Sequence, residues 1–366
     1  MLPVDWEEGM FLGRADFGDG PSPVLVRQGE LLDMAHVWPT VSALVESGDL
    51  SGAGGTSLGH FDPASARLLS PVDLQCVKAC GVTFALSAIE RVIEERARGD
   101  WSRAASIRER LESRIGGQIR SVQPGTPEAA SLKEALIEDG LWSQYLEVAI
   151  GPDAEVFTKS PVLSTVGPGA AIGIRSDSAW NNPEPEIVLL ADSLGAVVGA
   201  TLGNDVNLRD FEGRSALLLG KAKDNNASCS IGPLVRLFDD SFSIDDVRRA
   251  AVRLTIAGED GFVLEGVSNM AEISRDPLDL VRQTLSEHQY PDGFALFLGT
   301  LFAPVQDRDE PGRGFTHKVG DVVTIASDKL GRLVNRVVTS RDAPPWQLGI
   351  GAFYANLQRR GLLESA

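Results

Sequence analysis

The sequence predicts an α+β protein, with a small N-terminal α/β domain over residues 1–72 and a larger domain over residues 73–366. Two changes of pattern along the chain carry this prediction. Between residues 87 and 149, apolar residues recur at the three- and four-residue spacing of amphipathic helices. After Gly151, glycine and proline become frequent, and short apolar runs alternate with turn signals. The larger domain is therefore predicted to be a β-rich body that carries a helical insertion.

Composition and charge exclude several classes of protein. The 366 residues suggest about two domains, at roughly 150 residues each. The 51 acidic and 34 basic residues give a formal net charge of −17, which disfavours binding to the phosphate backbone of a nucleic acid. The longest apolar run, Phe294–Val305, is too short to span a membrane. We expect neither nucleic acid nor a membrane among the partners.

Two signals indicate a cytoplasmic protein. The first residues, MLPVDWEEG, have neither the basic nor the apolar region of a signal peptide. Three cysteines are too few for a disulfide framework, which fits a reducing compartment.

The elements of the N-terminal domain follow from its turn residues. The predicted elements are a turn over residues 16–23 (DFGDGPSP), a strand over 24–26, a short helix over 40–45, a loop over 51–59 (SGAGGTSLG) and a connection over 63–71. The helix is placed after Pro39, because proline is favoured at helix starts.

The helical insertion divides into two stretches. Residues 87–112 carry apolar side chains at helical spacing and are predicted to break near Gly99. Residues 127–149 form the second stretch, which begins at a proline. Beyond it, short β-type runs occupy residues 187–190, 196–200 and 262–264, and residues 320–325 and 330–338 are predicted to form a hairpin.

The segment NNPEPEI (residues 181–187) holds a candidate for chemistry. Pro183 and Pro185 favour an extended chain, which would direct the carboxylates of Glu184 and Glu186 to one face. Two crowded carboxylates repel each other unless a cation lies between them. The alternative is an acidic turn on the surface.

Two further residues gain meaning beside this pair. Asp205, in GATLGNDVNLRD, follows an apolar stretch in which an unpaired carboxylate would be costly to bury. Its alternative is a turn or a helix cap. Lys223, in KAKDNNASCSIGP, could be a solvated surface lysine, and Lys221 competes with it for any catalytic role.

Taken in order, these segments resemble the metal-binding core of the fumarylacetoacetate hydrolase family, and within it the 2-keto-3-deoxy sugar acid dehydratases. The matching segments are GVTFALSAIERVIEE, EVFTKSP, GIRSDSAW, NNPEPEIVLL, GATLGNDVNLRDFEG and AKDNNASCSIGP. The resemblance implies a mixed β-roll in the larger domain and a homodimer or a dimer of dimers. It also implies Glu184, Glu186 and Asp205 as ligands of Mg²⁺, with Mn²⁺ or Ca²⁺ as possible substitutes, because three carboxylates are a hard donor set.

One departure from the family pattern concerns the reaction. Hydrolytic members carry a His and a Glu three residues apart that activate water for C–C cleavage. Here Ser87 stands where the His would be, while Glu90 keeps the acid. This departure favours dehydration over hydrolysis. A second departure lies around the lysine, where Lys223 is preferred to Lys221 because its distance from Asp205 and from Gly232–Pro233 matches the family.

The implied reaction is the loss of water from a 2-keto acid such as 2-dehydro-3-deoxy-D-arabinonate, through an enolate that the metal stabilises, to give 2-oxoglutarate semialdehyde (2,5-dioxopentanoate). Lys223 would be the base, with its pKa lowered by the cation and by burial. Glu94 or Glu90 would donate the proton that leaves with the hydroxide. Residues 87–149 would form a lid, or else a packing or dimerisation appendage.

Five residues are candidates for substrate contacts, namely Ser87, Thr300, Lys159, Arg175 and Asn182. Thr300 would contact the substrate carboxylate, with a turn residue at a strand end as the alternative. The others would line the pocket, and for Lys159, Arg175 and Asn182 the alternative is a structural hydrogen-bond donor. Two other functions stay open: an acylpyruvate or diketo-acid hydrolase, and a family member that has lost catalysis and acts as a binding protein.

Overall fold

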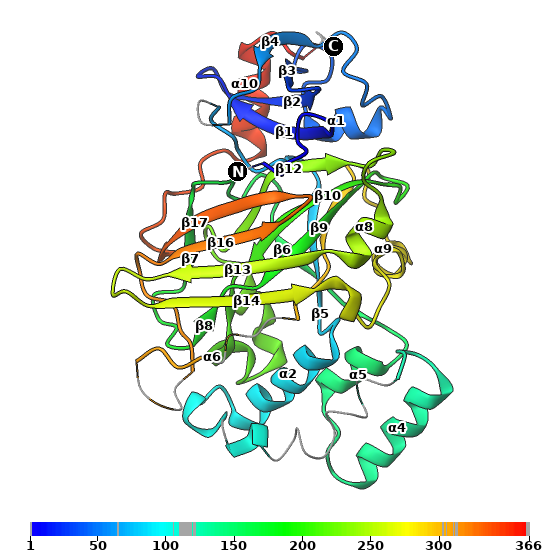
Figure 1. Ribbon diagram of the computed structural model, residues 1–366, viewed down its shortest axis with the longest axis vertical. Helices are drawn as coiled ribbons and strands as arrows, with labels where there is room; N and C mark the ends of the chain where they lie inside the picture. The colour runs from blue at the N-terminus through cyan, green and yellow to red at the C-terminus, as the bar shows by residue number, and fades with distance from the viewer. Residues whose placement is uncertain are drawn as a thin grey trace.

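The protein is described by a computed structural model that covers residues 2–63, 66–104, 106–109, 119, 122–301, 304, 306–309, 311 and 314–363. Figure 1 shows three parts along the long axis: the N-terminal strands at one end, the β-sheets in the middle, and the helices of the predicted insertion at the other end. Within the described ranges, no helix has the length and apolar character needed to cross a membrane.

The largest sheet has ten strands and mixed direction. They are β1 (Met10–Asp16), β2 (Pro21–Arg27), β3 (Glu30–Asp33), β4 (Thr56–His60), β5 (Cys76–Gly81), β6 (Glu155–Ser160), β9 (Pro185–Ala191), β10 (Val197–Asp205), β12 (Cys229–Leu237) and β15 (Phe294–Phe297). Their order is β4-β3-β2-β1-β12-β10-β9-β15-β5-β6. Only the β15–β5 pairing is parallel among these described strands.

A five-stranded sheet packs against the central strands of the first. It consists of β7 (Ala171–Ile174), β13 (Ala251–Ala257), β14 (Val263–Asn269), β16 (Val322–Ser327) and β17 (Gly331–Thr339), and a small ladder joins β8 (Asn181–Asn182) to β11 (Asn207–Leu208). Ile187 and Leu202 of the large sheet share one buried cluster with Leu254 and Ile325 of the smaller sheet. β16 and β17 pair as an antiparallel hairpin, as predicted.

Helices lie around both sheets. They are α1 (Val41–Glu46), α2 (Ala85–Ala97), α4 (Pro127–Glu138), α5 (Gln144–Ile150), α6 (Arg209–Glu212), α7 (Leu219–Lys223), α8 (Ile244–Arg249), α9 (Pro277–Leu285) and α10 (Ile350–Arg359), with 3₁₀ turns η1 (Trp101–Arg103), η2 (Ala216–Leu218) and η3 (Met270–Glu272). The fold is α+β, as the sequence predicts.

The helical insertion has its own apolar core. Ile93 of α2, Leu136 of α4 and Leu146 of α5 belong to one buried cluster. α2 ends at Arg98 in the left-handed conformation, followed by Gly99 at a φ of 72°, so the predicted break is confirmed. The predicted helical residues 110–112 lie outside the described residues.

The N-terminal strands continue the ten-stranded sheet, because β1 pairs with β12 of the larger domain. The predicted strand and helix are present as β2 and α1, and the Thr40 side chain caps α1 by accepting from Ala43 N–H. The predicted loop over residues 51–59 is wrong in its second half, where β4 pairs with β3 through backbone hydrogen bonds that glycine and serine do not prevent.

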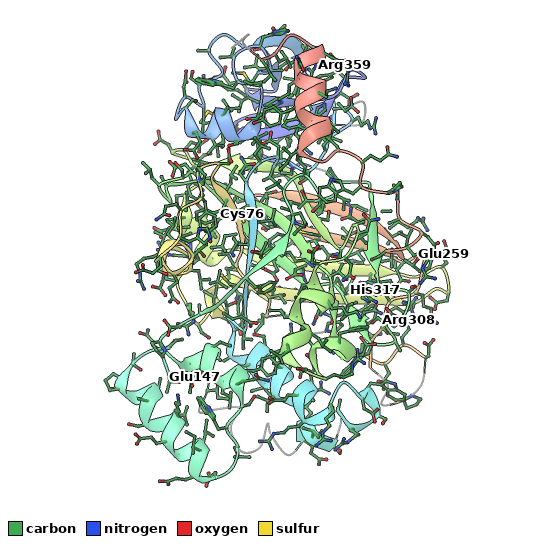
Figure 2. The ribbon with its side chains drawn as sticks, turned by 180° about the vertical axis from the view of Figure 1, so that it is seen from behind. Cys76, Glu147, Glu259, Arg308, His317 and Arg359 are labelled. Atoms are coloured by element: carbon green, nitrogen blue, oxygen red, sulfur yellow. The ribbon has the colours of Figure 1, made fainter. Side chains whose placement is uncertain are left out.

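The C-terminal helix α10, which was not predicted, completes the N-terminal part. Asn356 Nδ2 donates to the Asp19 carbonyl at 2.7 Å, and Arg360 Nη1 donates to the Pro21 carbonyl at 2.8 Å. Figure 2 labels Arg359 on this helix at one end of the molecule and Glu147 on α5 at the other. Helix α10 therefore packs on the connection between β1 and β2, at the end of the molecule opposite the helical insertion.

Candidate metal centre and active site

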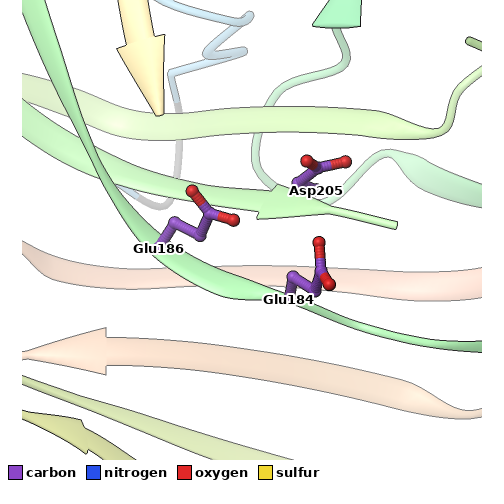
Figure 3. A group of neighbouring side chains, drawn as sticks. All are labelled: Glu184, Glu186 and Asp205. Atoms are coloured by element: carbon purple, nitrogen blue, oxygen red, sulfur yellow. The ribbon is translucent and has the colours of Figure 1, made fainter. Parts of the chain in front are cut away.

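Three carboxylates converge at the ends of the neighbouring strands β9 and β10. Glu184 precedes β9, Glu186 is its second residue, and Asp205 ends β10. Ligand atoms of the three side chains all lie within 4.8 Å of one another, and Figure 3 shows the carboxylates pointing toward a common space. The residues are 8%, 2% and 2% exposed, respectively, so the alternatives of a surface turn or a cap do not apply.

Local sequence explains this convergence. Pro183 and Pro185 keep the chain extended at the start of β9. In an extended chain, residues two apart point to the same face, so Glu184 and Glu186 lie on one face. Gly203 pairs opposite Glu186, and a side chain there would collide with the Phe297 ring. Asp205 N–H donates to the Glu184 carbonyl at 3.1 Å, which fixes the two strand ends together.

The charge of this group calls for a cation. Burial, followed by repulsion from Asp205 and Glu184, raises the pKa of Glu186 well above its usual value. Its Oε2 accepts a hydrogen bond from Gly299 N–H at 2.7 Å, a neutral donor. A buried set of three oxygen donors with this excess of negative charge fits a hard divalent cation such as Mg²⁺.

Lys223 lies at the end of α7, directly beside the three carboxylates. Its Nζ is 2.5 Å from Glu184 Oε2 and 3.1 Å from Asp205 Oδ2, and the residue is 2% exposed. Burial opposes the charge, but Asp205, Glu184 and Glu212 outweigh it and raise the pKa of Lys223. Without a bound cation, the pKa of Lys223 is therefore raised and not lowered as expected from the sequence, because three carboxylates surround one ammonium. Lys221 is exposed and outside the pocket lining.

The structure places Lys159 behind Asp205. This lysine of β6 is fully buried, its Nζ is 2.8 Å from Asp205 Oδ1, and it donates to the Lys223 carbonyl. Although burial alone would raise it, Lys159 and Lys223 hold the pKa of Asp205 below its usual value. Lys159 does not border the pocket, and its contact holds Asp205 in place, which agrees with the structural role that the sequence left open.

Two arginines and two glutamates form an ion-pair network beside the carboxylates. Arg91 of α2 contacts Glu184 and Glu94 at 2.9 Å each and also pairs with Glu212. Arg209 Nε lies 3.2 Å from Glu94 Oε1. The helical insertion thus contributes charged groups to the pocket itself.

Sequence reasoning did not single out Arg91, Arg209 or Glu212. A signal was available for two of them, because Arg209 and Glu212 lie three residues apart within the quoted segment NLRDFEG and share a face of α6. Arg91 could be found only from its spacing relative to Glu94 on a helix whose orientation the sequence does not reveal.

The remaining predicted residues divide into two groups. Ser87, Glu90, Glu94, Asn182 and Thr300 line the pocket with the carboxylates. Both oxygens of Glu90 accept from Arg108, at 2.9 and 2.6 Å, and Asn182 Oδ1 accepts from Arg209 Nε at 3.0 Å. Arg175 does not border the pocket, and its guanidinium donates to Asp177 at 2.8 Å, which agrees with the structural role that the sequence left open.

Ser87 also has a structural role that can be measured. Its Oγ donates to the Phe84 carbonyl at 2.7 Å, in the first turn of α2. We expect Ser87→Ala to lower the free energy of unfolding by about 1–2 kcal/mol, because two part-buried hydrogen bonds are lost: the donation to the Phe84 carbonyl and the acceptance from Phe84 N–H at 3.3 Å. Urea unfolding measures this change. Ser131→Ala, on the exposed face of α4, is the control and should change stability by less than about 0.5 kcal/mol. Equal stability of Ser87→Ala and the wild type would contradict the assignment.

Comparisons with known proteins agree with this architecture. Residues 147–338, more than half of the chain, match the family model described as fumarylacetoacetate (FAA) hydrolase C-terminal. The chain is 33% identical over 202 residues to a probable 2-keto-3-deoxyxylonate dehydratase of Haloferax volcanii, covering 55% of this chain and 66% of that protein. It is 31% identical over 190 residues to the 2-dehydro-3-deoxy-D-arabinonate dehydratase of Saccharolobus solfataricus, covering 51% and 59%. The match therefore spans less than two thirds of either relative.

Solved structures share the fold over most of the chain. The apo form of 2-keto-3-deoxy-D-arabinonate dehydratase has a TM-score of 0.65 at 22% identity, covering 90% of this chain and 99% of that one. The same enzyme complexed with magnesium and 2,5-dioxopentanoate has a TM-score of 0.64 at 22% identity, covering 90% and 98%. A fumarylacetoacetate hydrolase from Exiguobacterium antarcticum has a TM-score of 0.55 at 16% identity, covering 90% and 99%. At these identities the likeness shows the fold alone.

Proposed function

The chain belongs to the fumarylacetoacetate hydrolase family, and we propose that it is a Mg²⁺-dependent hydro-lyase that removes water from a 2-keto-3-deoxy sugar acid. One observation carries the proposal. Three buried carboxylates and Lys223 border a pocket whose described lining includes Ser87 and contains no histidine. The histidine that hydrolytic relatives use to activate water has no counterpart in that lining.

Glu184, Glu186 and Asp205 would hold the ion. Bound there, Mg²⁺ would polarise the keto group of the substrate and acidify the protons on C3. Lys223 would exchange a proton with C3. Its ammonium is stabilised by the protein's carboxylates, and a divalent cation held by the same carboxylates would favour the neutral amine. Arg91 orients Glu184 through a 2.9 Å contact.

Residues of the helical insertion would exclude water from the reacting atoms. Ser87, Arg91 and Glu94 of α2 and Tyr145 of α5 border the pocket, and a site shielded from water strengthens its electrostatic interactions. We propose that Ser87, Asn182 and Thr300 contact the substrate, and that residues 87–149 act as a lid over it.

The finer assignment is a five-carbon substrate, 2-keto-3-deoxypentonate, with 2,5-dioxopentanoate as product. The names of the two curated relatives support this choice, as does the ligand in one structure of the same fold. A homodimer and a cytoplasmic location complete the proposal. They rest on family resemblance and on the small number of cysteines.

A substrate panel tests the proposal. Purified protein with Mg²⁺ is offered five- and six-carbon 2-keto-3-deoxy acids and acylpyruvates, and semialdehyde and pyruvate are measured separately. We expect semialdehyde from at least one 2-keto-3-deoxypentonate, and its complete loss when EDTA removes the metal. Release of pyruvate would identify a hydrolase or another C–C cleaving enzyme. Substrate binding without any product would identify a binding protein.

A further inference from the structure

We propose that Glu212 acts at the far end of the substrate, first as the acid that protonates the leaving C4 hydroxyl and then as the base that removes a proton from C5. This inference rests on the proposed dehydration. It assigns two proton transfers that the metal ligands and Lys223 do not cover, because conversion of a 2-keto-3-deoxypentonate to a semialdehyde changes three carbons in a row.

The groups of the pocket lie in the order that the substrate needs. The three carboxylates would hold the end that carries C1 and C2. Lys223 Nζ lies next, within 3.1 Å of Asp205, and Glu212 Oε1 lies 3.8 Å from that Nζ. A chain of carbon atoms bound at the carboxylates and passing Lys223 at C3 would therefore bring C4 and C5 toward Glu212.

Glu212 has a carboxylate oxygen available for this work. The residue is 4% exposed, and within the described part of the chain its Oε1 makes no hydrogen bond. Its Oε2 is held by Arg91, and its backbone carbonyl accepts from Tyr145 Oη at 3.3 Å. One oxygen is thus fixed by Arg91, while the other is buried without a hydrogen bond from the described residues and has the Lys223 ammonium 3.8 Å away. A buried oxygen without a hydrogen bond is costly in a site that has no ligand to offer one.

A second hollow lies next to the pocket and shares Glu212 with it. Glu212, Tyr145 and Ala216 border both the pocket with the carboxylates and a neighbouring hollow that Arg98 and Arg214 also line. Arg98 and Arg214 are exposed, so this hollow faces solvent. A water molecule formed beside Glu212 would be released into it.

Two other glutamates that border the pocket, Glu94 and Glu90, are less suited to the task. Glu94 has one oxygen at Arg91 and the other at Arg209, and Glu90 has both oxygens bound by Arg108. Each of these two residues thus has both oxygens occupied by guanidinium groups, whereas Glu212 has only one oxygen so occupied. Burial, by contrast, raises the pKa of Glu212 to about 7 in spite of Arg91 and Lys223, so that both protonation states are accessible near neutral pH.

The proton transfers balance without a further reactant. Lys223 takes a proton from C3, the C4–O bond breaks with its electron pair on oxygen, and Glu212 protonates that oxygen to give water. The product of this step has a C3=C4 double bond conjugated to the keto group. Glu212, now a carboxylate, takes a proton from C5, and Lys223 returns its proton to C3. The resulting C4=C5 enol becomes the aldehyde by exchanging protons with solvent, and both residues regain their starting states.

Proton NMR in D₂O separates the two halves of this scheme. Glu212→Gln with Mg²⁺ and 2-keto-3-deoxypentonate should still exchange C3 protons for deuterium, while aldehyde forms more than about a hundredfold more slowly than with the wild type. The increase in Tm on adding Mg²⁺ should match that of the wild type. Glu147→Gln, which changes a half-buried glutamate of α5 that pairs with Lys133 and lies outside the pocket lining, is the matched control and should retain full activity.

Other outcomes would overturn the role of Glu212. Dehydration by Glu212→Gln at the wild-type rate would do so, and so would the joint loss of C3 exchange and dehydration in a variant that still gains Tm with Mg²⁺. Glu212→Asp keeps the charge and serves if Glu212→Gln does not fold; we expect retained exchange with slower aldehyde formation, and wild-type aldehyde formation would count against the role. Absence of both exchange and dehydration in the wild type would instead refute the proposed function.

Discussion

Glu186→Gln is expected to abolish the rise in Tm on adding Mg²⁺ and to lower activity by more than about a hundredfold. Residues that merely orient metal ligands already contribute 10- to 100-fold to metal affinity or activity, and a ligand should contribute more. The metal-free variant should be as stable as the wild type or more stable, because Asp205 and Glu184 repel the buried Glu186 carboxylate. Glutamine can still accept the hydrogen bond from Gly299 N–H.

The variant should thus lose the Tm increase with Mg²⁺ while its metal-free form keeps its stability. This combination distinguishes loss of a ligand from loss of the fold. Thermal unfolding with and without Mg²⁺ measures both quantities in one experiment. Glu155→Gln is a useful comparison, because Glu155 also borders the pocket but does not belong to the three-carboxylate group. An unchanged Mg²⁺ response in Glu186→Gln would exclude this residue as a ligand.

Lys223→Met should lower dehydration by about 10²- to 10⁴-fold, the usual contribution of a general base. It should also stop the exchange of C3 protons in D₂O, which separates it from Glu212→Gln. Binding of Mg²⁺ should persist, because the variant loses an ammonium that lies 2.5 Å from Glu184 and 3.1 Å from Asp205 and would compete with a cation.

Lys221→Met is the matched control for this variant. Both lysines belong to α7, but Lys221 is exposed and lies outside the pocket lining. We expect wild-type dehydration and exchange from it, measured under the same conditions. A normal rate in Lys223→Met combined with loss of activity in Lys221→Met would reverse the assignment of the base.

The two glutamates of the candidate metal site could be predicted from the sequence because their geometry is local. Two glutamates separated by one residue, between prolines, share a strand face wherever the strand lies. Asp205 required more, since its place beside Glu184 depends on the pairing of β9 with β10. The family resemblance supplied Asp205 as a candidate ligand without that pairing, and periodicity alone could not.

Contacts between side chains that are far apart in the sequence could not be predicted. Lys159 was considered for the pocket, but it lies behind Asp205 and pairs with its Oδ1. Its strand, β6, is an edge strand of the ten-stranded sheet, and the sequence does not reveal which residues that edge approaches. The contacts of Arg91 with Glu184 and Glu212 bridge α2 to β9 and α6, and no sequence spacing encodes them. The pKa of Lys223 likewise depends on anions that tertiary structure brings together.

Secondary structure was predictable where residue patterns were strong. The β16–β17 hairpin and the end of α2 agree with expectation, since turn residues mark both. β4 was mistaken for a loop because backbone pairing with β3, and not side-chain character, stabilises this exposed edge strand.

We propose that the Glu184, Glu186 and Asp205 group supports dehydration of a 2-keto-3-deoxy sugar acid. Proton NMR of 2-keto-3-deoxypentonate incubated with the protein and Mg²⁺ tests it most directly, because substrate, water-loss product and cleavage product are seen in one spectrum. We expect the signals of 2,5-dioxopentanoate to grow as those of the substrate decline, and to be absent with EDTA. A pyruvate methyl signal in their place, or the same product formed equally fast with EDTA, would contradict the claim.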